Sequence, residues 1–359
     1  MKIKSVLVLG LGKVGSLVGT LLHKTGFKVT GADIYAKDGL PFPAITTDMS
    51  NMESIEQKLK GFDAVISCLP YNYNIDVATV AHKLGVHYFD LTEDVPTTKA
   101  IIEMSKNANT VMAPQCGLAP GFIAIVGAAL ASNFTKIRSI KLRVGALPQH
   151  PTGLLGYAFN WSPEGVVNEY LNDCEVIEGG QHKWVSPMEW IEQLFIHGIQ
   201  LEAFTTSGGL GTMCETYLGK VDNLDYKSIR YPGHVKQMNF FFHELLMRED
   251  RKRAGEILTN AKPAVNDDVV YVHASAEGFQ DKQLFRDEFV KAYYPVTIDG
   301  KKWRAISWTT AASACAIIEM VNNGSLPDKG FIKQEDIGLN DFLKTKNGRL
   351  YSGEEHGAN

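Results

Sequence analysis

The sequence contains little cysteine, and its cysteines are scattered. Five cysteines occur among 359 residues, and none of them forms a closely spaced pair. This pattern provides neither a disulfide framework nor the paired spacing of a zinc site. We therefore expect reduced thiols, a cytoplasmic protein and no metal centre. The cysteines are Cys68, Cys116, Cys174, Cys214 and Cys315.

The sequence also lacks long apolar runs and a strong charge of either sign. No stretch reaches the roughly 20 uninterrupted apolar residues of a membrane helix. The apolar segment 5–11 ends at Lys13, and no small-residue cleavage site follows it, so we expect no secretory signal here. The formal net charge of −4 argues against nucleic acid or an anionic membrane as the main partner. The basic clusters at 248–253 and 301–304 are interpreted as solvated surface.

What remains is an ordinary globular composition, with 45% hydrophobic and 21% charged residues. A chain of this length is too long for one core, so we expect separate domains. The predicted boundaries give a dinucleotide-binding domain over 1–122 and a second domain over 123–305. A C-terminal helix and tail over 306–359 is predicted to return to the first domain.

The first 122 residues alternate between strand and helix patterns with short connections. This alternation implies a parallel sheet covered by helices on both faces, the α/β arrangement of a Rossmann fold. Strands are predicted at 4–9, 28–32, 44–47, 63–68, 87–90 and 110–112, and helices at 14–24, 55–59, 75–84 and 97–106.

The pattern changes after Ala113 to that of an α+β domain on a mixed or antiparallel sheet. Apolar and polar residues alternate cleanly in several segments, as they do in strands with one solvated face. Strands are predicted at 136–146, 267–276 and 288–298, with a hairpin turn at Asp299-Gly300, and helices at 121–132, 163–171, 234–248 and 308–322.

The segment 10–15, Gly-Leu-Gly-Lys-Val-Gly, lies between a predicted strand and a predicted helix. Gly10 permits a tight turn, Gly12 lets the backbone approach a pyrophosphate, and Gly15 allows close packing of helix on strand. Amide groups at the helix start then bind the phosphates. This context predicts a dinucleotide site.

Asp33, at the end of the next strand, is predicted to accept hydrogen bonds from the adenosine ribose. A carboxylate at this position repels a 2′-phosphate, so NAD is favoured over NADP. Lys37 lies close enough in sequence to reduce that repulsion. Asp48 could contact the adenine edge or cap the next helix.

Three further strand ends should meet at the same edge of the sheet, where such sheets bind ligands. Cys68, Leu69 and Pro70 are expected to face the nicotinamide ribose. Four side chains are candidates to contact cofactor or substrate: Tyr71, Asp90, Glu93 and Cys116. The structural alternatives are packing for Tyr71, a helix cap for Asp90, a surface charge for Glu93 and a buried thiol for Cys116. The predicted cofactor contacts are Gly10, Gly12, Lys13, Val14, Gly15, Asp33, Asp48, Cys68, Leu69 and Pro70.

Six motifs along the chain stand out: Gly-Leu-Gly-Lys-Val-Gly at 10–15, Pro-Tyr at 70–71, Pro-Gln-Cys-Gly-Leu-Ala-Pro-Gly at 114–121, Arg-Val-Gly-Ala-Leu-Pro-Gln at 143–149, Trp-Ser-Pro-Glu-Gly at 161–165 and Arg-Tyr-Pro-Gly-His at 230–234. Together they resemble the saccharopine dehydrogenase-like family, and the last three resemble its lysine 6-dehydrogenase branch. The resemblance implies a Rossmann domain, a substrate and dimerisation domain, a homodimer or higher homo-oligomer, and oxidation of a C–N bond with NAD. The segment 88–94 departs from that branch.

Hydride can leave a carbon that bears nitrogen only if the amine is neutral. Deprotonating a lysine amine costs roughly 4 to 5 kcal/mol at pH 7, so a base should receive the proton. The candidate bases are Tyr71, Asp90, Glu93 and His234, of which His234 could equally cap a helix or form a core hydrogen bond.

An arginine fork should bind the substrate α-carboxylate. Arg143 and Arg230 are the candidates, with a surface or interface salt bridge as the alternative for each. Glu164 is explained by its position in the first turn of a helix, and Trp161 is more typical of a core residue.

Two arginines in motif-like settings favour lysine over saccharopine, which carries three carboxylates. Saccharopine or a carboxyalkyl polyamine (the carboxynorspermidine type) remains an alternative substrate. An NAD-binding redox sensor without turnover is the alternative from another class of protein.

Overall fold

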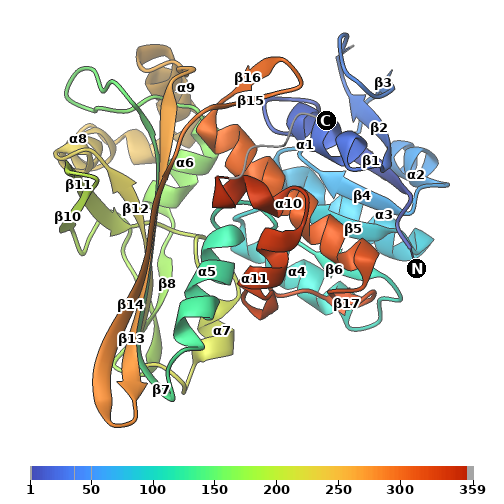
Figure 1. The fold of residues 1–359 in the computed structure, drawn as a ribbon. Helices are drawn as coiled ribbons and strands as arrows, with labels where there is room; N and C mark the ends of the chain where they lie inside the picture. The colour runs from blue at the N-terminus through green and yellow to red at the C-terminus, as the bar shows by residue number, and fades with distance from the viewer. Residues whose placement is uncertain (1, 36, 50, 354–359) are drawn as a thin grey trace. The chain divides into compact units, whose positions relative to one another are not determined.

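The computed structural model describes residues 2–35, 37–49 and 51–353 (Figure 1). The chain divides into two compact units. One unit contains the described residues up to Ile125 and those from Ser307 onward, and the other unit is Val126–Ile306. Residues 354–359 of the predicted C-terminal segment lie outside the described residues.

The first unit is built on a seven-stranded sheet in the order β17-β6-β5-β4-β1-β2-β3, in which every pair is parallel. The central strands β1, β4, β5 and β6 are buried on both faces, as a parallel sheet requires, whereas the edge strands β3 and β17 are not. The predicted doubly wound sheet is confirmed. Its strands are β1 (Ser5–Leu9), β2 (Lys28–Asp33), β3 (Ala44–Thr46), β4 (Ala64–Ser67), β5 (His87–Asp90), β6 (Val111–Ala113) and β17 (Gly330–Phe331).

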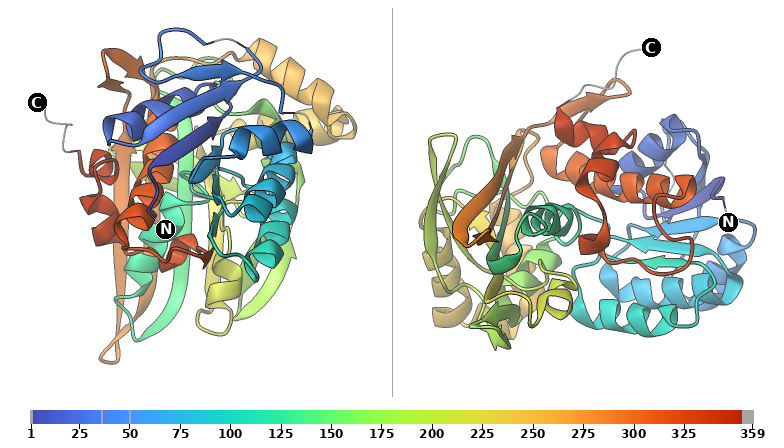
Figure 2. Two further views of the ribbon diagram at one scale, coloured as in Figure 1. Left: turned by 90° about the vertical axis from the view of Figure 1, so that its right-hand side faces the viewer. Right: turned by 60° about the horizontal axis from the view of Figure 1, so that its bottom comes forward.

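Helices cover both faces of this sheet (Figure 2). The helices α2 (Met52–Leu59), α3 (Asn74–Leu84) and α4 (Val95–Ser105) share one core with the strands. The helices α1 (Gly15–Lys24) and α10 (Ala305–Asn323) lie together on the other face, where the Cys315 thiol donates to the Val18 carbonyl at 3.6 Å. The small helix α11 (Leu339–Lys344) also belongs to this unit, and α5 (Phe122–Ala131) contains the boundary between the units.

The second unit contains a mixed sheet in the order β10-β11-β12-β7-β13-β14, with β8 paired to β12 and β9. The pair β7·β12 is parallel and the others are antiparallel. The strands are β7 (Lys136–Pro148), β8 (Cys174–Glu178), β9 (Gln181–Val185), β10 (Glu192–Ile196), β11 (Ile199–Thr205), β12 (Asn223–Arg230), β13 (Asp268–Gln280) and β14 (Gln283–Tyr293).

Helices α6 (Pro163–Leu171), α8 (His234–Asn239) and α9 (Arg251–Ala261) pack on one face of this second sheet. Their apolar side chains, such as Tyr170, Met238 and Leu258, share a core with Leu201 and Ile229 of the strands. The short helix α7 (Met213–Tyr217) follows β11 in the chain.

Two predicted elements of the second unit were wrong. The helix predicted over 234–248 ends at Asn239, widens into a π-helical turn over Phe240–Glu244, and stops at Leu246, which has a left-handed φ of +57°. The strand predicted over 288–298 breaks after Tyr293, because Pro295 has no N–H for a ladder. A new strand β15 (Val296–Ile298) then pairs with β16 (Lys301–Trp303) across the predicted Asp299-Gly300 turn.

Candidate active site

The glycine turn between β1 and α1 leaves open space at one position only. A Cβ on Gly10, whose φ is +83°, would lie 2.8 Å from the Cys68 carbonyl oxygen. A Cβ on Gly15 would lie 1.8 Å from the Gly10 carbonyl oxygen. At Gly12 a Cβ would meet nothing within 4 Å. The flanking glycines thus pack backbone on backbone, while Gly12 presents bare backbone to unfilled space, as a pyrophosphate site requires.

Asp33 lies at the end of β2 and is tied to this turn. Its carboxylate accepts hydrogen bonds from the Leu11 amide at 2.7 Å and the Tyr35 amide at 3.0 Å. These bonds fix a negative charge beside the glycine turn. Lys37, four residues after Asp33, is half-buried, and Lys13 in the glycine turn is exposed. Val14 occupies the N-cap position of α1.

Asp48 is exposed, and it is not the N-cap residue of α2. The N-cap of that helix is Asn51, whose side-chain oxygen accepts from the Ser54 amide at 2.8 Å. The backbone carbonyl of Asp48 accepts from the Ser54 hydroxyl at 2.6 Å. Asn51 therefore occupies the N-cap position of α2, and contact of Asp48 with adenine stays a prediction.

The segment after β4 lies close to the glycine turn. The evidence is that a Cβ on Gly10 would clash with the carbonyl oxygen of Cys68. The Cys68 amide donates to Leu9 at 2.8 Å. Desolvation, with the charge of Asp90 as a smaller cause, raises the pKa of the Cys68 thiol to about 12, so the group is a neutral thiol. Leu69 and Tyr71 are half-buried and Pro70 is exposed.

Asp90, at the end of β5, is fully enclosed and joins three segments. Its Oδ2 accepts from the Tyr88 hydroxyl at 2.6 Å, and its Oδ1 accepts from the amides of Thr92 at 3.0 Å and Gln115 at 2.9 Å. Burial raises the pKa of Asp90 to about 6, although these hydrogen bonds oppose the rise. Asp90 therefore holds the edge of the sheet together from the inside.

Cys116 is also enclosed, in the segment 114–121. Its thiol donates to the Ala113 carbonyl at 3.1 Å, and the Gln334 amide binds the Pro114 carbonyl at 3.0 Å. Burial, together with the charge of Asp90, raises the pKa of the Cys116 thiol well above its ordinary value. A thiolate nucleophile at Cys116 is thereby disfavoured. Gln115 adopts a left-handed φ of +65° within this segment.

Burial separates the predicted acid–base candidates of the first unit. Asp90 and Cys116 have no exposed surface, whereas Tyr71 and Glu93 are half-buried. A group that exchanges a proton with a substrate must reach it. Tyr71 and Glu93 are therefore the candidates that meet this condition in the structure.

Arg143, on β7 of the second unit, is buried in an ion-pair network. Its guanidinium binds Glu192 through Nε and Asp225 at 2.6 Å, and Lys227 contacts Glu192 at 2.9 Å. Burial by itself raises the pKa of Glu192, but Arg143 and Lys227 outweigh this and lower it to about 2. Arg143 therefore forms salt bridges, as the alternative predicted, but in a buried network and not at the surface.

Arg230 and His234 belong to a buried chain of hydrogen bonds centred on Tyr170. Arg230 Nε donates to the Tyr170 oxygen at 2.7 Å, and Tyr170 lies 3.0 Å from His234 Nε2. Burial and the nearby Arg230 lower the pKa of His234 to about 3, so its ring is neutral. Nδ1, which lies 2.9 Å from the Leu155 carbonyl, is then the donor, and Nε2 accepts from Tyr170. This position makes His234 a poor base.

Sequence reasoning missed Tyr170 and Glu169, which face this arginine. Glu169 lies 4.0 Å from Arg230, and burial raises its pKa to about 7 despite the arginine. Their positions on α6 carry no motif that singles them out. The two remaining candidates on or before α6 behave as expected: Trp161 packs against the core, and Glu164 lies in the first helical turn.

Comparison with known proteins identifies the family. The Saccharopine dehydrogenase NADP binding domain matches residues 6–115, and the Saccharopine dehydrogenase C-terminal domain matches residues 117–350. The chain belongs to the saccharopine dehydrogenase family. The predicted resemblance is confirmed at the level of the family.

Individual relatives of the saccharopine dehydrogenase family are distant. Saccharopine dehydrogenase [NADP(+), L-glutamate-forming] of Pyricularia oryzae is 24% identical over 250 residues, 65% of this chain and 56% of that protein. The enzyme of the same name from Schizosaccharomyces pombe is 26% identical over 151 residues, 40% of this chain and 34% of that protein. The matched part of the chain therefore spans about half, or less, of these relatives.

A solved structure shares the fold across nearly the whole chain. Apo saccharopine dehydrogenase (L-Glu forming) from Saccharomyces cerevisiae has a TM-score of 0.74 at 16% identity, covering 97% of this chain and 98% of that one. At this identity the likeness establishes the fold. Within the part of the chain that the structure describes, no helix combines the length and the apolar character needed to traverse a bilayer.

Proposed function

We propose that this protein is an NAD-dependent dehydrogenase that oxidatively deaminates the ε-amine of L-lysine. The observation that carries the dehydrogenase assignment is the glycine turn, with unfilled space at Gly12, packed backbone at Gly10 and Gly15, and the Asp33 carboxylate fixed beside it. When bound there, the nicotinamide cofactor accepts the hydride.

The preference for NAD rests on Asp33. The family domain that matches this part of the chain is described as NADP-binding, and the relatives carry NADP(+) in their names. In this chain a carboxylate held by two amides occupies the end of β2. That charge favours two free ribose hydroxyls over a 2′-phosphate.

The residues of this chain then act on the substrate amine. The Glu93 carboxylate, or Tyr71 as its phenolate, receives the ammonium proton, which leaves a lone pair on nitrogen for the oxidation. Water adds to the resulting imine, ammonia leaves, and the semialdehyde cyclises. Asp90 positions the backbone at Thr92 and Gln115 around this edge, and remains enclosed throughout.

The ion pairs of Arg143 favour lysine over a substrate with several carboxylates. Because the Arg143 guanidinium already binds Glu192 and Asp225, it is not available to bind a substrate carboxylate. Arg230 keeps a weaker partner, Glu169 at 4.0 Å, and its role toward a substrate carboxylate stays a prediction. The lysine 6-dehydrogenase motifs point the same way.

Saccharopine is the second candidate substrate, because both relatives and the structural neighbour bear that enzyme's name. Incubation with L-lysine or saccharopine, each with NAD or NADP, distinguishes the two by the absorbance of the reduced cofactor. We expect reduction with lysine and NAD, with release of ammonia. Reduction with saccharopine alone would overturn the substrate, and tight NAD binding without turnover of either would favour a sensor.

The pH profile tests the deprotonation step separately. Since the free lysine amine has a pKa of about 10.4, we expect kcat/KM to rise from pH 7 toward 10. A flat profile would contradict a neutral amine as the reacting species.

A further inference from the structure

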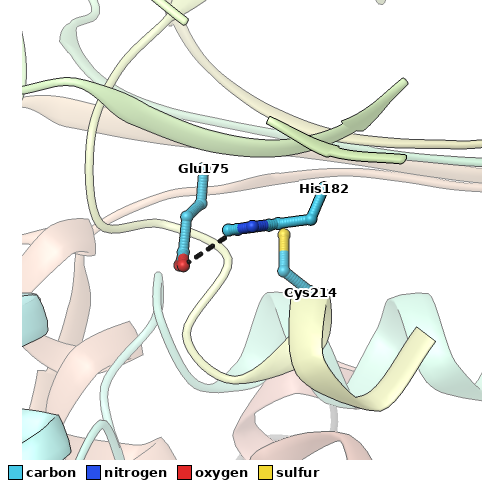
Figure 3. A group of neighbouring side chains, drawn as sticks. All are labelled: Glu175, His182 and Cys214. Atoms are coloured by element: carbon cyan, nitrogen blue, oxygen red, sulfur yellow. Dashed lines mark hydrogen bonds and ion pairs between the residues drawn. The ribbon is translucent and has the colours of Figure 1, made fainter. Parts of the chain in front are cut away.

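Three potential metal ligands meet within the second unit, outside the predicted site. Glu175 lies on β8, His182 on β9 and Cys214 on α7. Their ligand atoms all lie within 4.8 Å of one another. Figure 3 shows the Glu175 carboxylate and the His182 ring pointing toward each other above α7, with the Cys214 sulfur directed at the ring.

The register of the β8–β9 hairpin brings the first two together. His182 pairs with Ile177, and Glu175 pairs with Trp184, so Glu175 and His182 are diagonal neighbours on the same face. The hairpin closes through Gly179 and Gly180, whose φ angles are +60° and +75°. Cys214, the second residue of α7, then lies against this face.

The spacing suits a tetrahedral ion. Two ligand atoms on Zn²⁺ with bonds of about 2.0–2.1 Å lie roughly 3.4 Å apart. His182 Nε2 and Glu175 Oε1 are 3.2 Å apart, so an ion can replace the proton that now joins them. The Cys214 sulfur lies within 4.8 Å of the other two ligand atoms, so it needs to approach by roughly 1 Å to reach a bond length of about 2.3 Å.

The ligand types indicate which ion fits. A thiolate and an imidazole select zinc over magnesium or calcium, which prefer oxygen. Exposure increases across the cluster, from buried Cys214 to Glu175 at 17% and His182 at 35% of the side chain. The ion can thus enter from the His182 side, where water supplies a fourth ligand.

We propose that Glu175, His182 and Cys214 form a zinc site that joins the β8–β9 hairpin to α7. Among the described residues, β8 pairs with β12 of the main sheet at Asn223–Glu178 and Leu224–Ile177, which is a short pairing. An ion bound to both elements adds a cross-link that this short pairing lacks. Binding displaces the protons of the thiol and of His182 Nε2 to solvent, and no redox step is involved.

The test is a zinc titration of the full chain after treatment with a chelator, in competition with a chromophoric chelator. We expect one Zn²⁺ per chain in the wild type, with a Kd at least tenfold higher in His182→Gln and in Cys214→Ser. Cobalt in place of zinc should give a thiolate-to-metal charge-transfer band that Cys214→Ser removes and Cys174→Ser retains.

The controls are Cys174→Ser, a buried cysteine on β8 outside the cluster, and His197→Gln, an exposed histidine in the β10–β11 turn. Zinc should raise the thermal midpoint of the wild type and both controls, and raise that of His182→Gln less at the same zinc concentration. Because His182 is exposed, this variant should fold even if Cys214→Ser does not. Absence of stoichiometric zinc in the wild type, or equal affinity in His182→Gln, would overturn the proposal.

Discussion

Asp90 shows how burial changes the role of a residue that sequence reasoning singles out. Its position at a strand end was predicted, but its enclosure was not, because the alternating pattern does not reveal the Tyr88, Thr92 and Gln115 groups that close around it. The same holds for Cys116 and His234, which are enclosed as well. Residue type and spacing indicate where polar groups gather, while access depends on packing between distant segments.

Asp90→Asn should alter the pH dependence of stability. The pKa of Asp90 is raised from 3.8 to about 6, so the carboxyl contributes most below pH 4, and this contribution is lost as the pH rises through 6. The amide keeps an acceptor and does not titrate. Between pH 4 and 7 the wild type should therefore lose up to about 3 kcal/mol relative to the variant. Urea unfolding at intervals of one pH unit measures this, and a constant difference would contradict it.

Asp33→Asn should weaken the preference for NAD. The amide oxygen can still accept from Leu11, while the negative charge is removed. We expect the ratio of the Kd for NADP to that for NAD to fall about tenfold, equivalent to about 1.4 kcal/mol. Titration with both cofactors measures the ratio. Asp38→Asn, an exposed acid in the same loop, is the matched control, and an equal change in both variants would contradict a specific role.

At the scale of elements, the first unit was predicted almost strand by strand. Strands such as β4 are buried along their whole length and read as continuous apolar runs between helices. In the second unit, β8 to β12 were missed. The side chains of β9 are mostly exposed, so no apolar alternation marks it. The helix predicted over 234–248 was too long, because the pattern of apolar residues does not reveal the change from an α-helix to a π-helix at Phe240.

Glu192→Gln should loosen the link between β10 and the centre of the second sheet. The carboxylate binds buried Arg143 on β7 and Lys227 on β12. Removing the charge of Glu192 leaves Asp225 as the carboxylate partner of Arg143. We therefore expect the free energy of unfolding at pH 7 to fall by about 2–3 kcal/mol.

The matched control is Glu178→Gln, whose partner Lys183 is 47% exposed. This surface pair should contribute less than about 1 kcal/mol. The pKa of Glu192 is lowered from 4.5 to about 2. Its contribution to the free energy of unfolding is therefore fully present above pH 4.5 and is lost as the pH falls from 4.5 through 2. Equal losses in the two variants, measured by chemical unfolding, would contradict the buried network.

At the scale of the whole molecule, local patterns identified the glycine turn and the family motifs, but not the order of strands in the second sheet. The parallel pairing of β7 with β12 joins segments about 80 residues apart, and no local signal specifies such a partner. The Glu175, His182 and Cys214 cluster was missed for the same reason, because a hairpin and a later helix bring these residues together. The C-terminal helix α10 belongs to the N-terminal unit.

The central claim is that bare backbone at Gly12 holds a dinucleotide, and calorimetric titration with NAD tests it directly. Wild type should bind one NAD per chain. Gly12→Ala adds a Cβ that meets no protein atom within 4 Å, so the fold should be unchanged, while the methyl group occupies space needed by the pyrophosphate. We expect affinity to fall at least tenfold, about 1.4 kcal/mol, with no change for Gly255→Ala in α9. No binding of NAD or NADP by the wild type, or unchanged affinity in Gly12→Ala, would contradict the claim.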